Sequence, residues 1–262
     1  MVDIAVLLSV GSHPASGRAR PAPLDAQALK LALRLLEAGQ ATRIHALHAG
    51  NPSEPALRGY LGMGLDRLDV LETAPGTDPV PALAARLREL APALILTGAV
   101  AEGGEDSGMV PYLIAQALNH TLVPDIIGIE FTNNEAALTQ ALPRGQRRLV
   151  ETSLPLVATL HSSAPAARQS AFARARRGTI DVTIDVRPAT VTANDEFLAE
   201  CTVRPWRPRP KLMRVQRGGS ALDRMKAATE TKTGQGQLMV QPTPDEAAIA
   251  IYDCLVQQGM IC

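Results

Sequence analysis

The residues with the clearest chemical potential lie in one glycine-rich segment, 94–111, which reads LILTGAVAEGGEDSGMVP. It opens with an apolar run suited to a buried strand, continues with glycines at 98, 103, 104 and 108, and passes into a helical pattern at 111–118. Glycines let backbone N–H groups come close to a phosphate, and a helix N-terminus attracts an anion. A strand, a glycine-rich loop and a helix in this order predict a nucleotide site.

The glycine spacing differs from the two common phosphate-binding patterns. It is neither GxGxxG nor GxxxxGK[ST], and the loop contains no lysine, so hydride transfer and nucleoside triphosphate hydrolysis are not indicated. Glu102, Glu105 and Asp106 would repel a phosphate, and we expect them to point outward or toward hydroxyl groups. An exposed loop that binds no ligand is the alternative interpretation of this segment.

No other group of residues in the sequence indicates catalysis or metal binding. The histidines are scattered, and Cys201, Cys254 and Cys262 form neither a CxxC pair nor a cysteine–histidine cluster. No serine or cysteine lies in a nucleophile motif. We therefore predict a protein with no catalytic residues and no metal site.

The elements that would position the loop form an alternating pattern. Short apolar runs at 4–8, 44–48, 68–71 and 94–97 have the length and composition of strands buried on both faces. Helical patterns separate them, and the first helix is expected to end before Gly39. This alternation predicts an α/β fold with a doubly wound, mostly parallel sheet. Ligands bind at the carboxyl ends of the strands in such sheets, so the loop is expected at that edge.

The pattern changes after residue 120. Strands predicted at 126–131, 136–142, 147–150 and 156–160 are typical of an antiparallel meander, and TIDVTIDV after Thr179 predicts a further strand. Residues 168–177 are expected to form an exposed loop or short helix. The stretch VRPWRPRPKLMRVQRGG around Trp206 excludes a continuous helix and predicts an extended C-terminal arm, followed by a helix at 245–257. We expect an α/β domain at 1–190 and an arm with a helix at 191–262.

Composition limits the possible partners. Lysine plus arginine and aspartate plus glutamate each number 26, so no global field favours nucleic acid or an anionic membrane. The N-terminal residues lack a basic n-region, and no stretch approaches the about 20 apolar residues that span a bilayer. We expect a cytoplasmic protein that binds no nucleic acid and is not inserted in a membrane.

Three segments together resemble the β subunit of electron transfer flavoproteins. They are APLDAQALKLALRL at 22–35, LRGYLGMGLDRLDVL at 57–71 and the loop at 98–111. The family's segments read roughly NPxDExALEEALRL, LRxALAMGADRAxxL and GxQAxDDDxxQxGP, and the resemblance extends over most of 1–190. The matching positions are Pro23, Asp25, Ala28 and Leu29, then Leu57, Arg58, Leu61, Met63, Gly64, Asp66 and Arg67, and finally Gly98, Ala101 and Pro111.

The resemblance implies an adenine-nucleotide alpha hydrolase-like fold and a heterodimer with an α subunit that holds most of the redox-active FAD. This chain would carry electrons without turning over a substrate, and it would bind a structural AMP, or a second FAD as in bifurcating relatives. Ser9 and Val10 replace the family's basic pair, and Gly103, Gly104 and Glu105 replace its triple aspartate. The implied nucleotide contacts are Leu7, Pro23, Leu24, Asp25, Ala26, Ala49, Gly98, Ala99, Val100, Ala101, Gly103, Gly104, Ser107, Gly108 and Met109.

The family's partner-recognition loop aligns with 162–178, SSAPAARQSAFARARRG. Gln169 lies near the family's anchoring leucine, Phe172 is the nearest large apolar residue, and Arg174, Arg176 and Arg177 retain the basic tail. The resemblance implies docking to an amine or methylated-glycine dehydrogenase rather than an acyl-CoA dehydrogenase, transfer toward a membrane quinone oxidoreductase, and a C-terminal arm wrapped around the α subunit. An arginine-rich loop without a partner is the alternative for this segment.

A different class of function stays open at this point. A nucleotide-binding regulatory or stress protein of related architecture would act as a homodimer without flavin. A minimal domain of that kind needs neither a meander nor an arm, so these features favour the electron carrier. A stand-alone enzyme of phosphate chemistry is the least supported, because the loop lacks a lysine, metal ligands and a general base.

Overall fold

The computed structural model describes residues 2–102, 107–132, 135–184, 201–202, 225 and 239–257. Residues 1–201 and 202–262 are two separate units. Helix α8 (Pro244–Gln257) belongs to the second unit and confirms the helix predicted at 245–257. The predicted boundary at residue 190 and the predicted arm around Trp206 lie outside the described residues.

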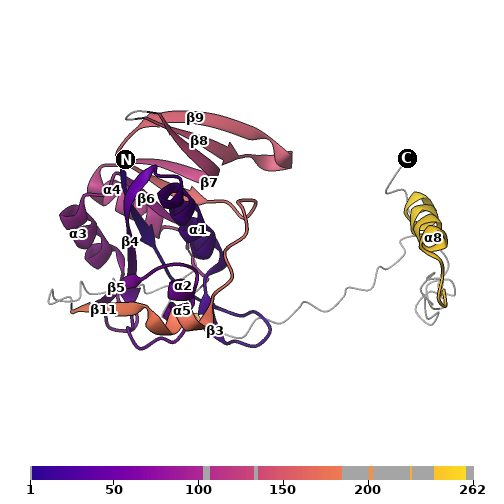
Figure 1. Cartoon of the computed structure of the whole chain (residues 1–262), viewed down its shortest axis with the longest axis horizontal. Helices are drawn as coiled ribbons and strands as arrows, with labels where there is room; N and C mark the ends of the chain where they lie inside the picture. Colours follow the sequence, from indigo (N-terminus) through magenta and orange to yellow (C-terminus); the bar gives the residue numbers. More distant parts are fainter. Residues whose placement is uncertain are drawn as a thin grey trace. The chain divides into compact units, whose positions relative to one another are not determined.

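The first unit is built on a sheet whose described strands follow the order β11-β5-β4-β1-β6-β10-β7-β8-β9 (Figure 1). The chain passes from β1 through β4 to β5 on one side, then crosses back to β6 on the other side of β1. This reversal defines a doubly wound sheet and confirms the predicted fold class. The mutually parallel strands are β1 (Val2–Leu7), β4 (Ala41–Gly50), β5 (Arg67–Glu72), β6 (Leu94–Gly98), β7 (Thr121–Thr132), β10 (Leu156–Leu160) and β11 (Thr179–Ile184).

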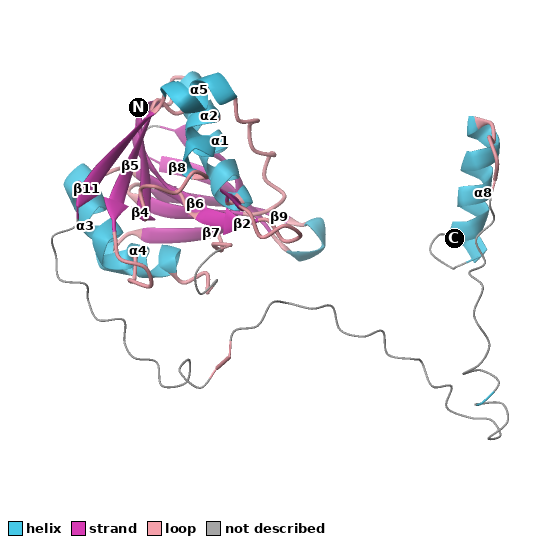
Figure 2. Ribbon diagram, turned by 90° about the horizontal axis from the view of Figure 1, so that it is seen from below, coloured by secondary structure: helices cyan, strands magenta, loops and turns pink. Residues whose placement is uncertain are grey.

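Helices cover both faces of the parallel strands (Figure 2). On one face lie α1 (Pro23–Glu37), α2 (Leu57–Gly62) and α5 (Phe172–Arg177), and on the other lie α3 (Val80–Leu90) and α4 (Val110–Leu118). Alternate residues of β1 separate two cores, because Ile4 and Val6 pack in one cluster and Ala5 and Leu7 in the other. The central strands β1, β6 and β10 are therefore buried on both faces, as the apolar runs at 4–8 and 94–97 predicted for β1 and β6. Within the described ranges, no helix is long and apolar enough to cross a membrane.

Helix α1 follows directly from its sequence. Pro23 stands at its first position and Asp25 in its first turn, where a fixed φ and a negative charge both favour a helix start. Leu29 and Leu33 belong to its buried stripe; each buried leucine contributes about 1.5–3 kcal/mol. Gly39 follows the helix end with a φ of 70°, the left-handed conformation that favours glycine.

The antiparallel meander is shorter than predicted. It contains β7, β8 (Glu135–Ala141) and β9 (Arg147–Ser153), with the one-turn helix η1 (Pro143–Gly145) between the last two. The assignment of 156–160 to this meander is wrong, because β10 inserts between β6 and β7 and runs parallel to both. All residues of β10 are buried, which is typical of a central parallel strand rather than an edge hairpin.

Candidate functional site

The carboxyl ends of β1, β4 and β6 meet at one edge of the sheet. Leu7 ends β1, Gly98 ends β6, and Ala49 is the penultimate residue of β4. The chain changes direction between β1 and β6, which makes this edge the topological switch point where open α/β sheets bind ligands. The structure thus brings predicted contact residues from three strands to the same edge.

A buried carboxylate joins the elements at this edge. Asp25 is only 3% exposed. Its Oδ2 accepts hydrogen bonds from the backbone N–H and the hydroxyl of Ser9, at 2.7 and 2.5 Å, and its Oδ1 accepts one from the backbone N–H of Gly98 at 2.8 Å. One side chain therefore fixes the end of β1, the end of β6 and the start of α1 relative to one another.

Burial raises the pKa of the Asp25 carboxyl above its ordinary value. The hydrogen bonds from Ser9 and Gly98 oppose this shift, and the charge of Glu102 adds to it. Both carboxylate oxygens accept hydrogen bonds from donors within the chain. We conclude that Asp25, predicted as a nucleotide contact, shapes the edge through these bonds.

Tyr60 of α2 extends the same network. Its side chain is fully buried, and its hydroxyl donates to the carbonyl of Ser9 at 2.7 Å and accepts from the N–H of Ala22 at 2.8 Å. Burial and then the charge of Asp25 raise the pKa of the hydroxyl well above its usual range, so it stays protonated. Tyr60 was not singled out from the sequence. The available signal was that a tyrosine stands where the family pattern LRxALAMG has alanine.

Gly98 lies too close to α1 for a side chain. A Cβ at this position would lie 2.6 Å from Oδ1 of Asp25 and 2.8 Å from Cβ of Leu24. Both distances are far shorter than ordinary van der Waals contact. The absence of a side chain at the end of β6 is therefore required by packing at the site, independently of any ligand.

A hairpin formed by β2 (Val10–Ser12) and β3 (Ala19–Pro21) contacts the loop after β6. Arg20 donates two hydrogen bonds to the Glu102 carboxylate, at 2.6 and 3.1 Å. A Cβ on Gly11 would lie 2.9 Å from Cβ of Glu102, so the glycine makes room for this contact. Glu102 is exposed, and its pairing with a guanidinium that offsets its charge was not predicted from the sequence.

The remaining predicted contacts line the same edge. Pro23, Val100, Ser107 and Met109 are exposed, Leu24, Ala99, Ala101 and Gly108 are half-buried, and Ala26 is buried. Met109 caps α4 without a side-chain hydrogen bond to the helix. Because Pro111 has no N–H, the first-turn backbone donors of α4 are the N–H groups of Val110 and Tyr112. Gly103 and Gly104, with Glu105 and Asp106, lie outside the described residues.

Both histidines of β4 lie close to polar groups of the same chain. His48 is buried, and its Nδ1 lies 2.8 Å from the carbonyl oxygen of Leu8, to which a neutral ring can donate. Burial lowers the pKa of His48 and favours this neutral form. His45 lies 3.7 Å from the Asp3 carboxylate. Within the described part of the chain, no three His, Cys, Asp or Glu side chains are grouped to hold a metal ion.

Residues 162–178, called here the docking segment, end in α5. Phe172 is the first residue of that helix and is 77% exposed. Gln169, Arg174, Arg176 and Arg177 are also exposed, and none of these arginines forms an ion pair with another described residue. The structure thus places the predicted docking residues on and just before one short helix.

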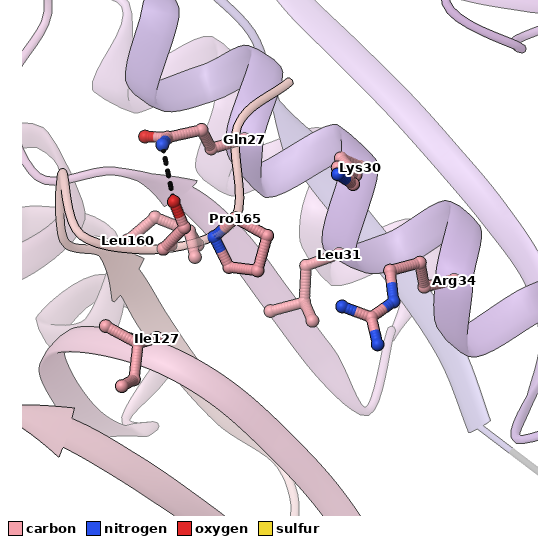
Figure 3. Close-up of a pocket in the computed structure, with 8 residues that line it drawn as sticks. Gln27, Lys30, Leu31, Arg34, Ile127, Leu160 and Pro165 are labelled. Carbon is pink, nitrogen blue, oxygen red and sulfur yellow. Dashed lines mark hydrogen bonds between the residues drawn. The ribbon is translucent and has the colours of Figure 1, made fainter. Parts of the chain in front are cut away.

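A small pocket lies beside the start of the docking segment (Figure 3). Its lining combines side chains from α1 with residues of β7, β10 and the following loop: Gln27, Lys30, Leu31, Arg34, Ile127, Leu160, Ala164 and Pro165. None of these is a predicted nucleotide contact. The pocket therefore belongs to the surroundings of the docking segment.

A doubly wound sheet with a glycine-containing loop at its switch point places the chain among the α/β proteins whose ligands bind at this edge of the sheet. The family model of the electron transfer flavoprotein domain matches residues 15–187. The chain is also 42% identical over 262 residues to electron transfer flavoprotein subunit beta of Chromohalobacter salexigens, covering 99% of this chain and 96% of that protein. The chain therefore belongs to the electron transfer flavoprotein β-subunit family, which confirms the resemblance.

Membership of this family fixes the general role of the chain. β subunits of electron transfer flavoproteins pair with an α subunit and carry electrons, and they do not turn over a substrate themselves. This result favours the electron carrier over the homodimeric regulatory protein without flavin.

Replacing Asp25 with Asn tests the buried carboxylate. The raised pKa means that the folded state holds the Asp25 proton more tightly than the unfolded state, so its contribution to stability is greatest below the unfolded pKa of 3.8 and declines as pH rises through the folded pKa. Asn also places an NH2 group where one carboxyl oxygen accepts a hydrogen bond, and a buried donor left without its acceptor costs about 1–3 kcal/mol at any pH. We expect Asp25→Asn to be less stable than the wild type. The difference between their free energies of unfolding, measured with urea, should become smaller from pH 4 to neutral pH. A gap that widens with pH would contradict the assignment.

Proposed function

We propose that this chain is the β subunit of a heterodimeric electron carrier whose α subunit holds most of the redox-active FAD, and that its own switch-point edge binds AMP. The observation that carries the proposal is the 42% identity to a β subunit over 99% of this chain, which spans both structural units. The FAD would supply the electron-carrying chemistry. The present chain would bind the nucleotide, shape the flavin surroundings and dock the donor.

The geometry of the edge supports a nucleotide. Met109 makes no side-chain cap on α4, and the N–H groups of Val110 and Tyr112 in its first turn would bind phosphate oxygens. Gly108, with a φ of 68°, gives the preceding loop its turn toward that helix. Val100 and Met109 are 41% and 49% exposed and offer apolar contact for a base. The Arg20–Glu102 ion pair offsets the acidic charge beside the loop.

AMP is the preferred nucleotide over a second FAD. The β2–β3 hairpin and the Arg20–Glu102 pair lie against the loop after β6. A mononucleotide needs less of this edge than a dinucleotide. The basic pair and the triple aspartate of the family patterns are absent here, and their absence favours neither nucleotide. The nucleotide contacts proposed from the sequence stay as given, with Gly98–Ala101 and Ser107–Met109 presenting backbone groups and Asp25 holding the edge in shape.

The docking segment supports a partner on the donor side. Phe172 offers an exposed apolar anchor at the start of α5, and Arg174, Arg176 and Arg177 add positive charge in the last turn of the same helix. An apolar pocket with an acidic rim on a dehydrogenase would complement this surface. We propose an amine or methylated-glycine dehydrogenase as donor, a membrane quinone oxidoreductase as acceptor, and a cytoplasmic location.

The second unit supports contact with the α subunit. Helix α8 exposes Ile249, Ile251 and Tyr252 to 61%, 62% and 56%. Apolar side chains of this size are usually covered in a stable complex. We propose that α8 and the arm before it pack on the α subunit.

Co-expression tests the proposed heterodimer. We expect the chain to copurify with its α subunit and to carry bound FAD in that complex, and to carry none when produced alone. The visible absorption spectrum and the FAD released on denaturation measure this directly. Tight flavin binding by the isolated chain, or no complex with any α subunit, would contradict the proposal.

Phe172→Ala tests the docking anchor. A central aromatic anchor typically contributes about 2 kcal/mol or more to binding, so the carrier concentration needed for half-maximal reduction by the donor should rise at least about thirtyfold. The bound flavin should be unchanged, because Phe172 lies on the surface. Leu149→Ala is the matched control, since Leu149 on β9 is 64% exposed. Equal donor kinetics in both variants would remove the assignment.

A further inference from the structure

The docking segment is held along α1 by side chains of that helix. Nε2 of Gln27 donates to the carbonyl oxygens of Ser162 and Ala164, at 3.3 and 2.9 Å, and the second of these bonds is drawn in Figure 3. Nζ of Lys30 donates to the carbonyl of Ala166 at 2.8 Å. Backbone carbonyls of the segment are thus bound by a helix of the folded core, which restrains the chain before it reaches α5.

Helix α2 holds the second half of the segment. The N–H of Ala171 donates to the carbonyl of Gly62 at 3.0 Å. A Cβ on Gly62 would collide with the hydroxyl of Ser170 and lie 3.1 Å from both the N and the O of Ala171. The segment therefore rests directly on the backbone of α2. Gly62 stands where the family pattern LRxALAMG has alanine.

Arg58 of α2 binds the C-terminal end of α5. Its Nη1 donates to the carbonyl oxygens of Ala175 and Gly178, at 3.1 and 3.5 Å. The last carbonyls of a helix have no partner within the helix, and a positive charge there is favourable. Arg58 therefore stabilises the short helix that begins with Phe172 and carries the three exposed arginines.

We propose that Arg58 and Gly62 are positioning residues that hold the docking segment in the conformation that binds the donor dehydrogenase. This inference rests on the proposed docking function of that segment. In this proposal neither Arg58 nor Gly62 contacts the dehydrogenase itself. They act by keeping Phe172 and the arginines of α5 on one preformed surface, so that little ordering is needed when the partner binds.

The expected effect on kinetics follows from the fraction of molecules whose docking segment has the binding conformation. If loss of the Arg58 bonds lowers the binding-competent fraction of the segment to about one fifth, the apparent affinity for the donor falls about fivefold. The maximal rate of electron transfer stays unchanged, because the complex, once formed, has the same geometry. A residue needed only for general stability would not separate these two parameters.

The experiment uses the purified heterodimer with its flavin. The variants are Arg58→Ala, Arg58→Lys and Gly62→Ala. Arg88→Ala is the matched control, because Arg88 of α3 also donates to a carbonyl near the end of a neighbouring helix, that of Ala117 at 2.8 Å. The donors are an N-methylglycine dehydrogenase, an amine dehydrogenase and an acyl-CoA dehydrogenase, and the parameters are measured with the one that reduces the wild type at the lowest carrier concentration.

Trypsin gives a second readout that does not depend on the donor. The segment contains Arg168, Arg174, Arg176 and Arg177 as cleavage sites. We expect Arg58→Ala and Gly62→Ala to be cut within the segment several times faster than the wild type and Arg88→Ala. We also expect an about fivefold higher KM for the carrier, an unchanged kcat, and partial recovery of the wild-type values in Arg58→Lys.

The outcomes separate this inference from the proposed function. If Phe172→Ala impairs reduction while Arg58→Ala and Gly62→Ala match the control in kinetics and cleavage, the positioning role is wrong and the docking role stands. If no donor responds to Phe172→Ala, or none reduces the wild type, the docking role itself is wrong. Loss of flavin or a lowered kcat in the Arg58 variants would overturn the inference in favour of a general structural role.

Discussion

The Asp25 carboxylate determines how the switch point of this sheet is assembled. It accepts hydrogen bonds from Ser9 and Gly98, so the ends of β1 and β6 are tied to the start of α1 by a single side chain. Burying a carboxylate costs several kcal/mol, and hydrogen bonds to charged groups, worth about 1.5–3 kcal/mol each, offset that cost. Tyr60 bonds to neighbouring backbone groups, and Gly98 leaves the space that the carboxylate needs. These contacts, all made within the chain, give the edge its shape without a nucleotide.

The docking segment is likewise held in place by hydrogen bonds from neighbouring helices, here at the surface. Its carbonyl groups are bound by Gln27 and Lys30 from α1 and by Arg58 from α2. Each of these bonds lies at or near the surface and contributes little to the stability of the whole protein. Together they restrain a segment that has few buried side chains of its own. The helices that build the core therefore also carry the proposed partner surface, which links the family's sequence motif in α2 to docking.

Much of the fold could be predicted because its signals are local. The strands β1, β4, β5 and β6 each contain a short, mainly apolar run, and α1 has Pro23 at its start and Gly39 after its end. The parallel placement of β10 could not be predicted, because a short connection after β9 suggests a hairpin and only its partners β6 and β7 show otherwise. The Arg20–Glu102 pair joins residues 82 positions apart, and the Asp25–Ser9 bonds join the first turn of α1 to the loop after β1. Such contacts depend on the folded sheet and leave no periodic pattern in the sequence.

The central claim is that the edge organised by Asp25 holds AMP in a carrier whose FAD lies mainly on the α subunit. The most direct measurement is to denature the purified wild-type heterodimer and quantify the released nucleotides by chromatography against protein concentration. The account predicts one FAD and one AMP per heterodimer. Two FAD and no AMP would contradict the assignment of AMP, and FAD alone in a single copy would contradict the edge as a nucleotide site.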